Sequence, residues 1–127
     1  MLELTIYNDI RKYYDDTYEI LLCDEIKNLI ILGNLLIGID GTDRTGWRNV
    51  DNWFMATVKN ENRVILSALM TPPHNLTLYE TNNLPNDGAL KVLIEGVADR
   101  VSITGVMSEK DLALRFAKIF NEVTGKN

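Results

Sequence analysis

Cysteine, histidine and proline are scarce in this sequence of 127 residues. The single cysteine, Cys23, excludes an internal disulfide and a zinc site that needs several cysteines. It comes directly after the apolar residues 20–22 of a predicted helix, a setting that favours a buried, unreactive thiol. Together with the single histidine, His74, it leaves one nucleophile–base pair open as an alternative.

An excess of positive charge and a long apolar run are missing as well. The chain has 13 lysines and arginines against 18 acidic residues, a net charge of −5 that argues against a nucleic-acid-binding surface. The longest apolar run, Leu29 to Ile39, is interrupted by glycine and asparagine and is too short to span a bilayer. The first residues lack the basic and apolar regions of a signal peptide. We expect a soluble, cytoplasmic protein with neither a nucleic acid nor a membrane as partner.

What the sequence does contain is typical of one globular domain. Hydrophobic residues make up 46% of the chain and charged residues 24%, so we expect residues 1–127 to form a single domain. The acidic residues are spread along the chain. The fragment Asp40-Gly41-Thr42-Asp43 lacks the later ligands and the terminal glutamate of a calcium loop, and we expect no metal site.

The first half of the chain predicts a strand and two helices. Leu2 to Tyr7 favours a short strand, and apolar residues at helical spacing predict a helix from Asp9, its cap, to Cys23. Asp24 resembles the cap of a second helix. The face that this second helix is expected to bury carries residues at helical spacing, broadened by Ile31 and Leu35: Ile26, Leu29, Ile30, Gly33, Leu36 and Ile37.

The second half predicts the sheet and two further helices. The three antiparallel strands are expected at Trp53–Val58, Arg63–Met70 and Leu76–Glu80. A helix from Asp87 to Asp99 precedes a strand at Arg100–Thr104, which a right-handed crossover would make parallel to the third strand. Ser108 with Asp111 predicts the cap of a last amphipathic helix that Gly125 ends. The fold class is α+β, a mixed sheet with helices on both faces.

A corner between two strands is the most distinctive local feature. It runs Thr71-Pro72-Pro73-His74-Asn75, and its two prolines cannot donate backbone hydrogen bonds inside a sheet. The corner therefore presents one imidazole and one carboxamide from rigid backbone. His74 has three interpretations: a packed corner residue, a wall of a substrate cleft, or a general base. No serine or cysteine nucleophile with an acid partner is visible to complete a triad.

The order of elements resembles the acetyltransferase fold of the GNAT family. Asn52-Trp53-Phe54, a hairpin, the Thr71–Asn75 corner and Gly105-Val106 before the last helix resemble the N-terminal region of bacterial two-part GNAT enzymes. This resemblance implies transfer of an acetyl group from acetyl-CoA to an amine. It also implies that the substrate cleft includes Trp53, Thr71, Pro72, Pro73, His74 and Asn75.

The sequence departs from that family at the phosphate-binding loop. Active GNAT domains have a glycine-rich loop before the crossover helix, where backbone N–H groups hold the cofactor pyrophosphate. The corresponding stretch here, Thr81 to Ala89, has one glycine and one proline, and Asp87 adds negative charge. We expect no cofactor to bind to this chain.

Three hypotheses of function follow from the resemblance and its departures. The first is an N-terminal accessory domain that contributes substrate-cleft residues to a C-terminal GNAT domain absent from this chain. The second is a stand-alone module that binds a small ligand or a protein. The third is a small complete enzyme that uses His74. We also expect a homodimer, formed through the strand edge at Arg100–Thr104 or a nearby apolar patch.

Overall fold

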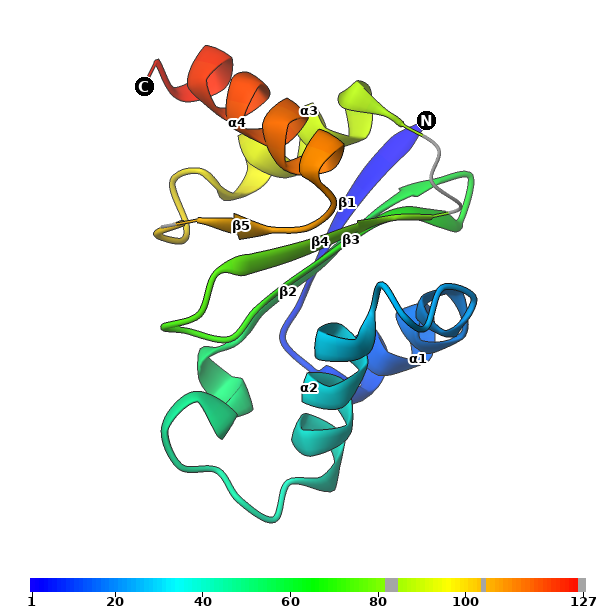
Figure 1. Cartoon of the computed structure of the whole chain (residues 1–127), viewed down its shortest axis with the longest axis vertical. Helices are drawn as coiled ribbons and strands as arrows, with labels where there is room; N and C mark the ends of the chain where they lie inside the picture. Colours follow the sequence, from blue (N-terminus) through cyan, green and yellow to red (C-terminus); the bar gives the residue numbers. More distant parts are fainter. Residues whose placement is uncertain (82–84, 104, 126–127) are drawn as a thin grey trace.

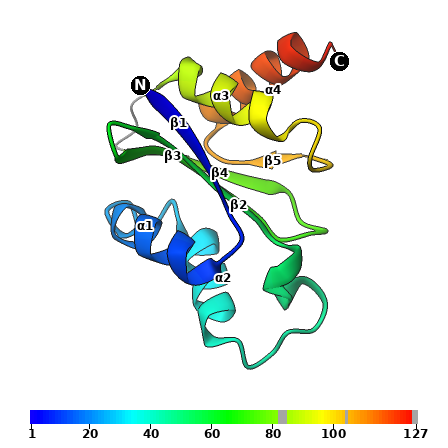
Figure 2. The same cartoon turned by 180° about the vertical axis from the view of Figure 1, so that it is seen from behind.

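The computed structural model describes residues 1–81, 85–103 and 105–125, which form an α+β fold around one five-stranded mixed sheet. Two helices cover one face of the sheet and two cover the other, as Figures 1 and 2 show from opposite sides. The strands lie in the order β1-β2-β3-β4-β5. This confirms the predicted fold class, with its mixed sheet and helices on both faces.

Adjacent strands among the first four are antiparallel to each other, and the fifth strand is parallel to the fourth. Their bounds are Leu2–Tyr7 for β1, Phe54–Asn60 for β2, Arg63–Met70 for β3, Leu76–Glu80 for β4 and Val106–Met107 for β5. Glu61 and Asn62 join β2 to β3 with positive φ angles of 51° and 70°, as a tight two-residue hairpin turn requires.

The predicted strand at Arg100–Thr104 is wrong. The backbone N–H groups of Arg100 and Val101 donate to the carbonyl of Val97, so the chain is still turning where a strand was expected. Thr104 lies outside the described residues. The parallel strand is β5, only two residues long, and a dimer edge at residues 100–103 therefore has no strand to support it.

Four α-helices carry the rest of the fold: α1 at Ile10–Leu22, α2 at Leu29–Asp40, α3 at Asp87–Val97 and α4 at Lys110–Thr124. Short 3₁₀ turns at Gly46–Arg48 and Val50–Asn52 lead into β2. The predicted cap Asp9 is confirmed, since its carboxylate accepts from the N–H of Arg11. Gly125 ends α4 in the left-handed conformation, also as predicted.

Two predicted helix caps and one predicted burial are wrong. Residues 24–28 are turns, and α2 follows Asn28 rather than Asp24. The residue before α4 is Glu109, while the hydroxyl of Ser108 donates to the carbonyl of Glu109. Cys23 is exposed, because it stands just beyond the last turn of α1 and its side chain is not on the packed face.

The two faces of the sheet bury separate apolar clusters. On the α3–α4 side, alternate residues of β2 and β3 such as Ala56 and Leu66 pack against the buried apolar residues of both helices. On the α1–α2 side, Tyr13, Leu35 and Trp53 pack against the intervening strand residues. Both faces of the central strand β3 are thus covered, as its apolar sequence predicts.

The α2 face that packs on the sheet centres on Ile31 and Leu35, which were expected to broaden the predicted face, whereas the main predicted stripe is wrong. Ile31, Leu32, Leu35 and Gly38 are buried, whereas Leu29, Ile30 and Leu36 are exposed. Eight of the twelve residues of α2 are leucine or isoleucine, so apolar spacing cannot select a face. Gly38 determines which face of α2 is buried, because a Cβ atom at this position would meet Ile10 and the indole ring of Trp53. Among the described residues, α2 and the other helices are each too short or too polar to cross a membrane.

Candidate functional site

The parallel pair β4–β5 delivers two carboxyl strand ends and two helix N-termini to one region of the molecule. Leu76 pairs with Val106 and Thr77 with Met107, and β4 then continues to Glu80. The helix α3 follows β4 along the chain, and α4 follows β5 (Figure 1). In sheets with parallel strands, ligands bind outside the carboxyl ends of those strands. A ligand cavity is therefore expected in this region.

A pocket of about 300 Å³ opens at these strand ends, between α2, β4 and the start of α4. We call it the β4–β5 pocket. It combines an apolar floor with hydroxyl, amide, carboxylate and ammonium groups on its walls, a mixture suited to a small polar ligand. Its lining residues are Lys27, Asn28, Ile30, Thr77, Leu78, Tyr79, Glu80, Met107, Ser108, Glu109 and Leu112.

Carboxylates occupy the helix N-termini beside this pocket. The carboxylate of Glu80 accepts from the N–H of Asn86, the residue that caps α3, at 3.0 Å. Asp87 is the first residue of α3, and Asp111 lies in the first turn of α4, two residues after Glu109. A helix N-terminus attracts negative charge, and here the protein supplies that charge itself. The negative charge of these carboxylates would therefore repel a pyrophosphate, whereas a cation could bind in the pocket.

Arg115 of α4 ties these carboxylates together. Its guanidinium donates to both oxygens of Glu80 at 2.7 Å, to Asp87 at 2.8 Å and to Asp111 at 3.4 Å. The Glu80 side chain is only 9% exposed. The hydrogen bonds to Glu80 are the main cause of a raised pKa for Arg115, so the guanidinium stays charged. Arg115 thereby holds Glu80 fixed at the pocket wall.

Lys27 forms the rim of the pocket on the α2 side. Its ammonium makes ion pairs with Glu109 and, at 3.6 Å, with Asp24. The hydrogen bond to Glu109 is the main cause that raises the pKa of Lys27. Glu109 is about half exposed. A ligand cation entering the pocket would therefore compete with Lys27 for Glu109.

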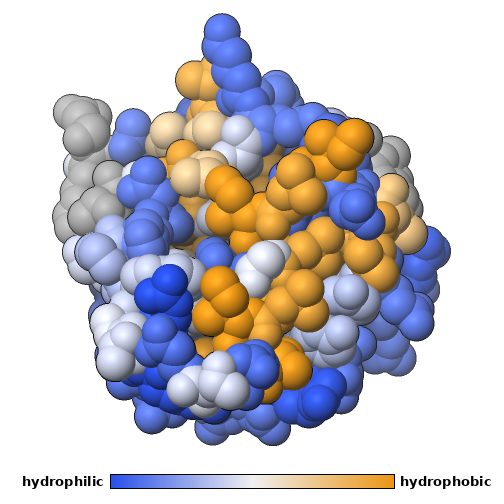
Figure 3. Space-filling view, turned by 60° about the horizontal axis from the view of Figure 1, so that its bottom comes forward, coloured by the Kyte–Doolittle hydropathy of each residue, from blue (hydrophilic) through white to orange (hydrophobic). Residues whose placement is uncertain are grey.

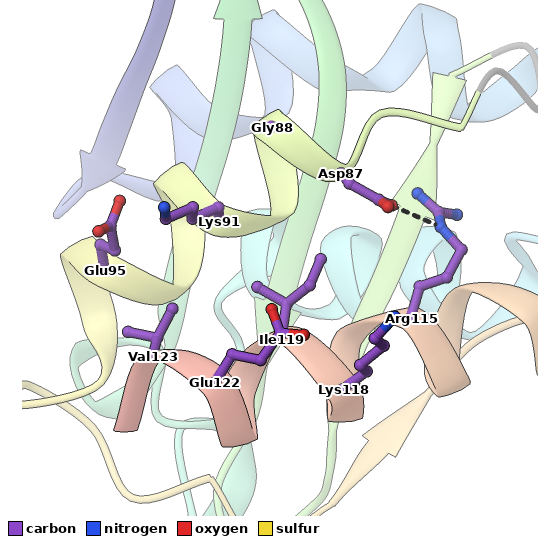
Figure 4. Close-up of a pocket in the computed structure, with 9 residues that line it drawn as sticks. All are labelled: Asp87, Gly88, Lys91, Glu95, Arg115, Lys118, Ile119, Glu122 and Val123. Carbon is purple, nitrogen blue, oxygen red and sulfur yellow. Dashed lines mark hydrogen bonds and ion pairs between the residues drawn. The ribbon is translucent and has the colours of Figure 1, made fainter. Parts of the chain in front are cut away.

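A second hollow of about 570 Å³ runs between α3 and α4 on the outer surface. Figure 4 shows Lys91 and Glu95 of α3 facing Lys118 and Glu122 of α4, with Arg115 and Asp87 joined at one end. Two lysines and two glutamates alternate along this groove. Its mixed charges make it an ordinary solvated helix surface, separated from the β4–β5 pocket by the Arg115–Glu80 pair.

The Thr71–Asn75 corner lies at the other end of β4. Thr71 is buried, the next four residues are exposed, and the Pro72–Pro73 peptide bond is cis. The Nδ1 atom of His74 lies 2.8 Å from the carbonyl oxygen of Thr71 and 3.2 Å from its hydroxyl. Because a carbonyl only accepts, Nδ1 carries the hydrogen, and Nε2 holds the lone pair of the neutral ring.

The corner is joined to the loop before β2 through two tryptophans. The ring of Trp47 lies edge-on to that of His74 at 5.5 Å, and the indole N–H of Trp53 donates to the Trp47 carbonyl at 2.5 Å. Trp53 is 7% exposed and belongs to the core. Asn75 instead lies against Gly105, where a Cβ atom would come within 2.9 Å of its amide oxygen. Trp47 and Gly105 were not among the predicted site residues.

The structure separates Cys23 from His74. Cys23 lies beside Arg63 and Val64 at the start of β3, whereas His74 follows the other end of that strand. Eight strand residues at roughly 3.3 Å each keep the two side chains far beyond hydrogen-bonding reach. A cysteine–histidine nucleophile pair is therefore excluded. Within the described ranges, no three histidine, cysteine, aspartate or glutamate side chains cluster closely enough to hold a metal ion.

Comparison with known protein families, with curated proteins and with solved structures finds no match to this chain. The resemblance to GNAT enzymes thus stays a prediction. The pocket residues Glu80 and Glu109, and Arg115, which binds Glu80 from outside the pocket, were missed because each is an ordinary charged residue in the sequence. One signal could have found the first two: an acidic residue at the carboxyl end of a strand, shortly before a helix.

Proposed function

We propose that this chain is the non-catalytic, substrate-binding module of a GNAT-type N-acetyltransferase, whose acetyl-CoA site and chemistry belong to a C-terminal GNAT domain. The observation that carries the proposal is the β4–β5 pocket, whose lining includes the carboxylates of Glu80 and Glu109. A pocket of this kind suits a small cation better than a pyrophosphate.

The arrangement of the sheet supports this proposal. Three consecutive antiparallel strands, a crossover helix, a parallel strand and a final helix follow one another as the resemblance to GNAT implies. The Thr71–Asn75 corner joins β3 to β4, the position that the resemblance gives it. The element order and the corner support the proposed shape of the module. The charged residues that line the pocket indicate the class of its ligand.

A primary amine is the ligand class that the pocket favours. The acceptor of an N-acetyltransferase is an amine, which carries a positive charge at neutral pH. Glu80 and Glu109 offer carboxylate oxygens, Thr77 and Ser108 offer hydroxyl oxygens, and Met107 offers apolar contact for the carbon chain. The net charge of −5 also draws cations to the protein.

In this proposal His74 has a structural role in the Thr71–Asn75 corner rather than the role of a base. It stands at the amino end of β4, away from the pocket wall formed by Thr77 to Glu80, and Nδ1 is held by Thr71. If the chain alone does transfer acetyl groups, His74→Ala tests the alternative in which His74 is the base. Unchanged turnover in that variant removes His74 from the chemistry.

Calorimetric titration with acetyl-CoA tests the absence of a cofactor cradle. We expect no binding heat in the micromolar range, because a pyrophosphate in the pocket would meet the carboxylates of Glu80 and Glu109, which line it. Coenzyme A without the acetyl group should behave the same way. Micromolar binding of either compound would overturn the assignment of the cofactor site to a separate domain.

A stand-alone binding module is the second candidate function. The observation that favours it is the exposed apolar face of α2. A module that binds only a small ligand does not need such a face, whereas a module that binds another protein does. If acetyl-CoA and amines both leave the protein unaffected, protein binding becomes the better description.

A further inference from the structure

The two carboxylates that line the β4–β5 pocket differ in how firmly their cations are held. Glu80 is nearly buried, and both of its oxygens accept hydrogen bonds from Arg115. Glu109 is 54% exposed and makes an ion pair with Lys27, whose side chain is 35% exposed. An exposed ion pair between two long side chains contributes little and opens readily. Glu109 is therefore the carboxylate at which a ligand cation can replace a cation of the protein.

The side chain of Lys27 can move while its backbone stays in place. Residues 24–28 form turns that end at the buried residue Asn28. The side-chain amide of Asn28 donates to the carbonyl of Leu21 at 3.1 Å, which fixes the backbone next to Lys27. The ammonium stands on a flexible four-carbon stem. It can therefore leave Glu109 for another anion at the pocket rim without a change in the fold.

A ligand that carries only an amine would leave this exchange incomplete. Its ammonium would take Glu109 from Lys27, which would keep the longer ion pair with Asp24, at 3.6 Å. A ligand with a carboxylate of its own gives Lys27 a new partner at the same time. One ion pair within the protein then becomes two ion pairs between protein and ligand. Charges of both signs at the pocket rim are thus complementary to a zwitterion.

We propose that the β4–β5 pocket binds an α-amino acid, whose ammonium pairs with Glu109 and whose carboxylate pairs with Lys27. Lys27 and Glu109 reach the pocket from opposite sides and are in direct contact, so the two charges of the ligand have to lie close together. An α-amino acid carries both groups on one carbon atom. This inference rests on the proposed function, in which the pocket binds an amine.

The remaining walls of the pocket indicate an apolar side chain on the ligand. Leu78 and Leu112 are buried beneath it, and the partly exposed side chains of Met107 and Ile30 also line it. Figure 3 shows apolar surface in a broad band on the end of the molecule that contains α1 and α2, and Ile30 belongs to α2. A volume of about 300 Å³ is at the small end for ligand pockets. Leucine is therefore a suitable probe.

Three small molecules separate this inference from the proposed function. They are L-leucine, 3-methylbutylamine, which is leucine without its carboxylate, and 6-aminohexanoate, an isomer of leucine with its charges at opposite ends. The amide signals of Thr77 and Ser108 in the nitrogen-15-labelled protein report the dissociation constants at about pH 7, where the amine and the carboxylate are both charged. We expect L-leucine to bind about fivefold tighter than either other compound, the upper value for one partly exposed ion pair.

The outcomes of this titration differ for the two proposals. If 3-methylbutylamine or 6-aminohexanoate binds as tightly as L-leucine, the α-amino acid inference is overturned and the amine site of the proposed function is kept. If none of the three compounds shifts these amide signals, the proposed function is overturned together with the inference.

Substitutions of Lys27 test the position of the ligand carboxylate. Lys27→Met should abolish the preference for L-leucine over 3-methylbutylamine, because the amine still finds Glu109 whereas the carboxylate loses its partner. Lys27→Arg keeps the charge and should keep the preference. Lys118→Met is the matched control, because it removes a lysine of α4 that does not line the pocket, and it should also keep the preference. A preference that persists in Lys27→Met overturns the proposal.

Glu109→Gln tests the position of the ligand ammonium. The side chain of Glu109 makes no capping hydrogen bond to α4, so this substitution should leave the helix intact. Both L-leucine and 3-methylbutylamine should bind at least about fivefold more weakly, because each loses its carboxylate partner. Unchanged affinity of both ligands for Glu109→Gln would overturn the proposal.

Discussion

Arg115 holds Glu80 by two parallel hydrogen bonds, from Nη1 to Oε1 and from Nη2 to Oε2, each 2.7 Å long. The two residues are 35 positions apart, one at the end of β4 and the other in α4. Both side chains are largely buried, at 9% and 17% exposure. This pair connects the pocket wall to the helix that follows β5, and it should matter for stability as well as for the pocket.

Arg115→Met keeps most of the side-chain volume but leaves the carboxylate of Glu80 without its cation. Removing one partner of a buried ion pair typically costs several kcal/mol, and we expect a loss of about 2–4 kcal/mol in the free energy of unfolding. Urea denaturation measures it. Lys118→Met, three residues along the same helix, is the control and should change stability by less than about 0.5 kcal/mol. Equal losses in both variants would contradict the role assigned to Arg115.

Asp16 gives the protein an acid-sensitive link between α1 and the sheet. Its carboxylate accepts from the hydroxyl of Tyr7 at 2.6 Å, from Lys59 at 3.1 Å and from Lys12 at 3.2 Å. Burial acts to raise the pKa of Asp16, but these hydrogen bonds outweigh burial and lower the pKa below its usual value. A lowered pKa contributes stability above the unfolded value of about 3.9, and that stability is lost as the pH falls through the folded value.

Asp16→Asn should therefore destabilise the protein by about 1–3 kcal/mol at pH 7, because charge-assisted hydrogen bonds are lost. The difference from wild type should begin to shrink as the pH falls below about 4, the usual value for aspartate in the unfolded chain, and should be lost as the pH passes through the lowered pKa of the folded protein. Chemical denaturation at a series of pH values measures both effects. Asp15→Asn, at an exposed neighbouring position, serves as the control. A difference that stays constant down to about pH 2 would show that the charge of Asp16 contributes nothing.

Gly38 and Gly33 lie in one helix and should respond oppositely to alanine. At Gly38 a Cβ atom would contact Ile10 and lie 2.9 and 3.0 Å from two ring carbons of Trp53. Overpacking of this kind costs about 1–3 kcal/mol, of which helix propensity returns up to about 1 kcal/mol. Gly33→Ala meets no atom and should stabilise the protein by about 0.8–1 kcal/mol. Thermal unfolding compares the two, and a stabilising Gly38→Ala would refute the packing described for α2.

The imidazole of His74 should be found with its hydrogen on Nδ1. The carbonyl oxygen of Thr71, 2.8 Å away, accepts that hydrogen, and the opposite tautomer would place a lone pair against it. Nitrogen-15 NMR of the two ring nitrogens distinguishes the two tautomers. The unfolded protein in denaturant is the reference, since the turn is absent there. A hydrogen on Nε2 in the folded protein would contradict the geometry of the corner.

Several elements of this fold could be predicted from sequence because one local signal dominated each. The stripe of Leu112, Phe116 and Ile119 has a polar face opposite, so only one side of α4 can be buried. The hairpin at Glu61 and Asn62 lies between two strands rich in β-branched and apolar residues. The corner at Thr71–Asn75 likewise followed from its two prolines.

Other elements depended on tertiary contacts that the sequence does not display. The face of α2 that is buried is set by the fit of Gly38 to Trp53 and Ile10, which lie far away in the chain. The parallel strand β5 is two residues long and has no periodicity to recognise. The pocket charges were equally hidden, since Glu80 and Arg115 become partners only when α4 packs beside the end of β4.

Binding of a small amine in the β4–β5 pocket is the central claim, and amide NMR of the nitrogen-15-labelled protein tests it most directly. Titration with 1,4-diaminobutane should shift the amide signals of Thr77, Ser108 and their neighbours, whereas acetyl-CoA should not. Met107→Trp, which fills the pocket with a larger side chain, should abolish the shifts, and Leu114→Trp on the outside of α4 should retain them. Shifts from acetyl-CoA at these amides, or no localised response to the diamine, would contradict the account.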